Sequence, residues 1–127
     1  MKRPSIFPAA AAVIATVVLF TAPRAHAHRY LDHAEPKVGS EVATSPREIK
    51  VWFTGAVDAS GTTIEVFDSN GTQVDKKDCH QDPNDKALMI VSVPELAAGT
   101  YKVTWHATST DTHKTKGDFQ FTVKAKG

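Results

Sequence analysis

The sequence contains a single cysteine, Cys79, among its 127 residues, and this excludes an internal disulfide bond. In an oxidising compartment such a domain depends on packing alone for its stability. Three roles remain open for the thiol: an ordinary loop residue, a crosslink between two chains, or a soft metal ligand together with its neighbour His80.

Long runs of lysine or arginine are also missing, and the start of the chain has basic residues but no acidic ones. Lys2, Arg3 and Arg24 are three of the 15 basic residues, whereas all 14 acidic residues follow them. The remainder is therefore mildly acidic, and it has no basic stripe that could attract a phosphate backbone. We expect no nucleic-acid partner.

A long apolar run occurs in only one place, residues 6–22. Two basic residues precede this run and Ala25-His26-Ala27 follows it, which is the pattern of a secretory signal peptide over residues 1–27. Cleavage after Ala27 leaves one domain, residues 28–127. The run is a little short for a spanning helix, which needs about 20 apolar residues. We therefore expect an exported mature form that is not membrane-embedded; cleavage after Ala25 and a retained anchor are the alternatives.

No segment has helical periodicity over three turns; instead, apolar and polar residues alternate as in β-strands. The predicted strands are a short opening strand at 30–31 and further strands at 49–53, 64–67, 73–75, 87–93, 101–105 and 119–123. Asn70-Gly71 predicts a hairpin turn, and residues 78–85 predict a polar loop. About seven short strands with frequent turns indicate an all-β, Greek-key antiparallel sandwich of the immunoglobulin-like or cupredoxin-like kind.

Two features of the mature chain could bind a metal. After cleavage, His28 has a free α-amine beside its imidazole, and this pair can close a chelate ring. Asp111 and His113 are two residues apart, so in an extended segment their side chains point to the same side. Three nitrogens and one oxygen suit a tetragonal site, and these donors favour Cu(II). Each feature alone also has an ordinary interpretation, as a free terminus and a surface loop.

Five stretches, with their order and spacing, are distinctive: His28-Arg29-Tyr30-Leu31, Glu35–Ser40, Ala98–Trp105, Ser109–His113 and Gly117–Val123. In these stretches the whole mature chain resembles the CopC family of periplasmic copper-binding proteins. The resemblance implies a Greek-key β-sandwich that carries or buffers Cu(II) without enzymatic activity. It also implies that His28, Asp111 and His113 are the copper ligands, and that copper is handed to a membrane transport partner or sequestered in the periplasm.

The sequence departs from the family pattern at two places. Some members have a glutamate near the copper, but here the corresponding stretch is Phe53-Thr54-Gly55. Some members also have a methionine-rich loop for Cu(I), but here that region contains Cys79 and His80 and no methionine. Met89 falls in a predicted strand and is expected in the core.

The other aromatic residues and histidines have simpler interpretations. Trp105 is expected in the core, close enough to the Asp-x-His segment to report on copper, whereas the strand phase turns Trp52 outward. His106 is expected on the surface, and His33 could reach the metal only if the chain folded back.

Two other function classes remain open. A copper-dependent oxidative enzyme can also hold its metal with an N-terminal histidine, although this chain is short and lacks an evident flat aromatic face. A secreted interaction module would need no metal at all. Metal binding through imidazole should weaken as the pH falls from about 7.5 to about 5, because each nitrogen donor must first lose its proton.

Overall fold

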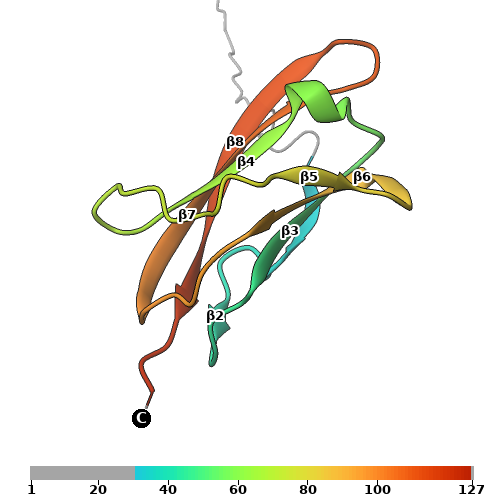
Figure 1. Cartoon of the computed structure of the whole chain (residues 1–127). Helices are drawn as coiled ribbons and strands as arrows, with labels where there is room; N and C mark the ends of the chain where they lie inside the picture. Colours follow the sequence, from blue (N-terminus) through green and yellow to red (C-terminus); the bar gives the residue numbers. More distant parts are fainter. Residues whose placement is uncertain (1–30, 127) are drawn as a thin grey trace, which may run out of the picture.

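The computed structural model describes residues 31–126, which form two four-stranded sheets packed face to face (Figure 1). The first sheet has the order β1-β3-β6-β5, made of Leu31–Glu35, Glu48–Phe53, Asp85–Ser92 and His80–Asp82. The second has the order β2-β8-β7-β4, made of Glu41–Val42, Lys114–Val123, Gly99–Thr108 and Thr63–Phe67. The predicted all-β sandwich is confirmed. The predicted leader and His28 lie outside the described residues.

Five of the six neighbouring strand pairs are antiparallel, as predicted, and one is parallel. The parallel pair joins β2 to β8, with Glu41 opposite Thr122 and Val42 opposite Val123. The chain therefore passes from the first sheet to the second between β1 and β2. Within residues 31–126, no helix is both long and apolar enough to cross a membrane.

The core lies between the sheets and consists of the inward residues of the alternating strands. In β3, Ile49, Val51 and Phe53 are buried while the residues between them are partly exposed. Trp105 on β7 is fully buried, and its ring meets that of Phe53 edge-to-face at 5.5 Å between centroids. The predictions that Trp105 and Met89 belong to the core are confirmed, and Trp52 is half-exposed, as its phase predicted.

The prediction of a return strand at 73–75 is wrong, although the turn before it forms. The turn forms, with Gly71 at φ 83° and its N–H donating to the Asp68 carbonyl over 3.0 Å. Gln73 then makes one isolated bridge to Phe67. The pairing ends because the buried carboxylate of Asp75, rather than a backbone carbonyl, accepts the Val66 N–H at 2.8 Å. A side chain that replaces a ladder partner in this way ends a strand.

Asp75→Ala is expected to lower the free energy of unfolding by about 1–3 kcal/mol, because a buried backbone N–H would lose its acceptor. The carboxylate also accepts hydrogen bonds from the Lys77 N–H and the Gln73 side-chain amide, each at 2.9 Å. Urea unfolding followed by circular dichroism measures the effect. Asp78→Ala is the comparison, since this exposed carboxylate accepts from the partly exposed Ser92 N–H. Equal small losses in both variants would contradict the assigned role of Asp75.

The predicted loop at 78–85 is also wrong, because it contains β5 and the start of β6. Gln81 lies opposite Met89, and the turn between the strands is closed by the Asn84 N–H, which donates to Asp82 over 2.9 Å. Pro83 lies in this turn and interrupts neither strand. A polar edge strand shows little alternation of apolar and polar residues. It forms through backbone pairing with the neighbouring strand.

Candidate metal centre

The segment between β7 and β8 is a tight turn. The Ser109 N–H donates to the His113 carbonyl and the Thr112 N–H donates to the Ser109 carbonyl, both at 2.9 Å. Thr112 has a φ of 71°, a left-handed conformation that is unfavourable for a β-branched residue. The expectation that this segment is extended is therefore wrong. Strained backbone of this kind is concentrated at functional sites.

The turn nevertheless brings together the two side chains that the sequence selected. The Nδ1 atom of His113 lies 4.0 Å from Oδ1 of Asp111. Both side chains are open to solvent, with exposed fractions of 73% for His113 and 76% for Asp111. An exposed imidazole and an exposed carboxylate at this separation can turn toward one ion without moving the backbone.

Ser109 holds the carboxylate in place, and sequence analysis gave it no role. Its hydroxyl donates to Oδ1 of Asp111, and it accepts the His113 N–H at 3.2 Å. The hydrogen bond from Ser109, followed by that from the His113 backbone, lowers the pKa of Asp111 below its ordinary value. Asp111 is therefore ionised and ready to bind a cation throughout the neutral and mildly acidic range. A serine two residues before an aspartate was the available sequence signal.

Ser109→Ala is expected to weaken metal binding at this turn by on the order of tenfold, because hydrogen bonds to a ligating carboxylate orient it. The pKa of Asp111 should rise toward its ordinary value in the same variant. Metal titration measures the first effect, and NMR titration of the Asp111 carboxyl measures the second. Thr110→Ala is a neighbouring control, and a metal affinity unchanged by Ser109→Ala would contradict the positioning role.

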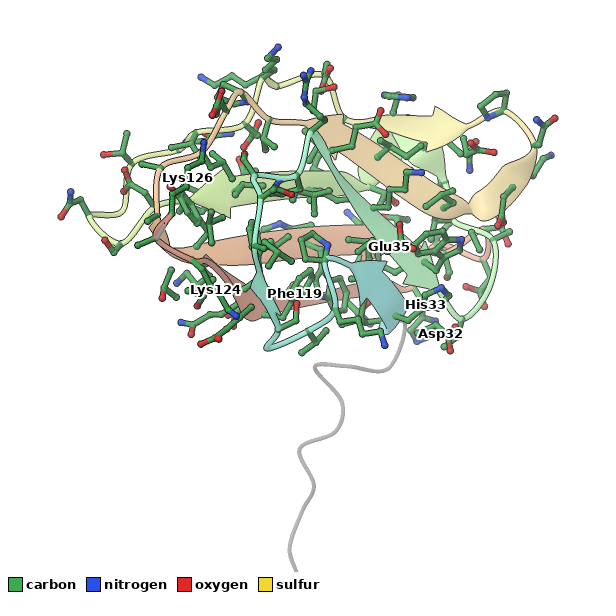
Figure 2. All side chains as sticks on the ribbon, turned by 90° about the horizontal axis from the view of Figure 1, so that it is seen from below. Asp32, His33, Glu35, Phe119, Lys124 and Lys126 are labelled. Atoms are coloured by element: carbon green, nitrogen blue, oxygen red, sulfur yellow. The ribbon has the colours of Figure 1, made fainter. Side chains whose placement is uncertain are left out.

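The turn lies at the end of the sandwich where the described chain begins. Leu31 pairs with Phe53, and four residues later Val57 bridges to Ser109. Figure 2 shows Asp32 and His33 at one end of the sandwich and Lys124 and Lys126 at the other. β8 therefore runs from the 109–113 turn toward the opposite end of the sandwich. His28, three residues before Leu31, lies outside the described residues. Among residues 31–126, no three His, Cys, Asp or Glu side chains form a metal-binding group.

Cys79 and His80 lie in different environments. Cys79 is partly buried against the core, and burial raises the pKa of its thiol. His80 is exposed, and its Nδ1 contacts the Asp78 carbonyl at 2.9 Å. A protonated thiol facing the core is a poor metal ligand. His106 is exposed on β7, as expected.

Comparison with known proteins places the chain in a family. The CopC domain matches residues 31–124, which span the complete sandwich. The chain belongs to the CopC family. Its sequence is 31% identical to protein YobA of Escherichia coli K12, covering 90% of this chain and 92% of that protein. It is 33% identical to copper resistance protein C of Escherichia coli, covering 85% and 90% of the two chains.

Solved CopC structures have the same fold. The crystal structure of CopC from Methylosinus trichosporium OB3b matches with a TM-score of 0.71 at 31% identity, covering 76% of this chain and 93% of that one. PcoC, described as a methionine-rich copper resistance protein from Escherichia coli, matches with a TM-score of 0.67 at 29% identity, covering 75% and 97%. The present CopC sequence differs in composition, since Met89 is its only methionine after Met1.

Proposed function

We propose that the mature chain is a periplasmic Cu(II)-binding protein that holds one copper ion with His28, Asp111 and His113. The observation that carries the proposal is the pairing of Asp111 with His113, 4.0 Å apart on an exposed turn in a CopC-family chain. The start of β1 at the same end of the sandwich supports His28 as the third contributor. Relatives named for copper resistance support copper as the metal.

The donor set favours Cu(II). Imidazole nitrogen, amine nitrogen and carboxylate oxygen suit a tetragonal site, and Cu(II) has the highest affinity in the divalent series. No methionine is available at the turn for the softer Cu(I). The carboxylate of Asp111, whose pKa is lowered, contributes a negative charge to the site.

A carrier or buffer fits these residues better than an enzyme. The Asp111–His113 pair is exposed, which allows copper to enter and leave. We expect the copper-loaded protein to consume no oxygen with a reductant, whereas a copper-dependent oxidative enzyme would consume it. A role in moving copper is supported by the copper transport protein CutJ of Bacillus subtilis, 26% identical over a region that is 22% of that protein.

The N-terminal chelate is tested by titrating Cu(II) into the mature chain that begins at His28 and into a form with one additional residue before it. We expect one-to-one quenching of tryptophan fluorescence in the mature chain and much weaker binding in the extended form, because the added residue removes the free amine from His28. The titration is repeated at about pH 7.5 and about pH 5. Affinity should fall at the lower pH, since nitrogen donors are protonated there while Asp111 stays ionised.

Each contradictory outcome has a distinct meaning. Equal affinity with and without the additional residue would remove His28 from the site. Binding unaffected by pH would remove the imidazoles. An absence of copper binding in both forms would leave a secreted interaction module of the CopC family.

A further inference from the structure

The start of β1 contains a β-bulge that no part of the proposed copper site explains. Leu31 lies opposite Phe53, but His33 lies opposite Trp52, so Asp32 is an additional residue in its strand. Adjacent side chains on a regular strand point to opposite faces of the sheet. Here the side chains of Asp32 and His33 are both exposed, with exposed fractions of 58% and 56%. Bulges often redirect a side chain beside a functional site.

Two contacts fix the redirected imidazole. Nδ1 of His33 lies 2.7 Å from Oδ2 of Asp32. The His33 ring also stacks on the Trp52 indole, with 4.4 Å between the centroids and 10° between the planes. Asp32 and His33, both labelled in Figure 2, lie together at the edge of the sandwich. Asp32 therefore contacts one nitrogen of the imidazole ring and Trp52 covers one of its faces, while the rest of the side chain is exposed to solvent.

This arrangement prepares the other ring nitrogen for a metal. When Nδ1–H donates to a carboxylate, Nε2 carries the free lone pair, and the carboxylate fixes the orientation of the ring. Metal-ligating histidines commonly have such a carboxylate on the second nitrogen. Within residues 31–126, nothing hydrogen-bonds Nε2 of His33. The other exposed histidines described above lack this combination of a carboxylate partner and an aromatic support.

We infer that Nε2 of His33 is the ligand of a second, weaker Cu(II) site, oriented by Asp32 and supported by Trp52. It lies on the β1-β3-β6-β5 sheet, whereas the 109–113 turn belongs to the other sheet. The choice of copper rests on the copper-binding role proposed above, but the site needs none of the ligands proposed there. A single protein nitrogen completed by water binds more weakly than a chelate, so this site takes and releases copper at higher concentrations.

The test uses a background in which the proposed strong site is removed, the mature chain with His28→Ala, Asp111→Ala and His113→Ala. Cu(II) is titrated and tryptophan fluorescence is followed, because copper at His33 lies beside the Trp52 ring and quenches it. We expect saturable quenching in this background, with a midpoint raised at least tenfold by His33→Gln. Asp32→Asn should raise the midpoint by several-fold, since it removes the carboxylate that fixes the tautomer and the orientation of the ring.

His106→Gln, at an exposed histidine on β7 that has no carboxylate contact among the described residues, is the matched control and should leave the midpoint unchanged. The inference is overturned if His33→Gln has no effect, if His106→Gln or His80→Gln has an equal effect, or if the background shows no quenching. The proposed strong site is judged separately, by the first equivalent of copper in the chain with His28, Asp111 and His113 intact. Failure of one site therefore leaves the other standing.

Discussion

His113→Ala is expected to weaken Cu(II) binding by on the order of 100-fold, or about 2.7 kcal/mol. The substitution removes the imidazole that lies 4.0 Å from Asp111 and leaves only the carboxylate on the turn. Residual affinity would come from the N-terminal chelate of His28. Competition with a chelator of known copper affinity measures the change, because direct titration saturates when binding is tight.

His106→Ala is the matched control for this substitution. His106 belongs to the same hairpin and is also exposed, but it lies opposite Lys116 on β8 rather than on the turn. Its replacement should leave copper affinity within about twofold of the parent. If both substitutions had similar effects, or if His113→Ala had none, the turn would not be the copper site.

Trp105→Ala is expected to have the largest effect on stability, a loss of about 3–5 kcal/mol in the free energy of unfolding. Trp105 is fully buried between the sheets and contacts Phe53 edge-to-face. Domains of this size are stable by only about 5–15 kcal/mol, so this variant should unfold partly at moderate temperature. Urea unfolding followed by circular dichroism measures the loss.

Trp105→Phe separates packing from polarity at the same position. Within the described residues, the buried Nε1–H of Trp105 has no hydrogen-bond partner. Phenylalanine retains much of the ring contact and removes this uncompensated donor, so we expect a smaller loss of about 1–2 kcal/mol. A loss as large as that of Trp105→Ala would mean that Nε1 is satisfied, for example by a buried water molecule.

The sequence predicted the strands that bury one face and missed those that depend on a partner. β3, β7 and β8 follow from alternating apolar residues, because burial of one face imposes that alternation. β5 is polar and forms by pairing with β6, so its own residues carry little signal. The return strand at 73–75 was overpredicted because the Asp75 side chain competes with the backbone for the Val66 N–H.

The closeness of Asp111 and His113 was predicted correctly but for the wrong geometric reason. Alternation along an extended chain would place them on one side; the structure instead closes a turn through Ser109 and a left-handed Thr112. Hydrogen bonds that close a turn depend on local side chains, and residue spacing alone does not reveal them. The part assigned to His28 stays a prediction, since that residue lies outside the described chain.

The position of β8 also determines when this protein can fold. β8 is the last strand in the sequence, yet it lies inside its sheet, between β2 from the first part of the chain and β7 (Figure 1). Until it has been synthesised, β2 has no neighbour and Phe119, Phe121 and Val123 are missing from the core. A growing chain therefore cannot complete the sandwich from its first part alone. This late closure would suit the export that the sequence predicts, in which the chain crosses a membrane before it folds.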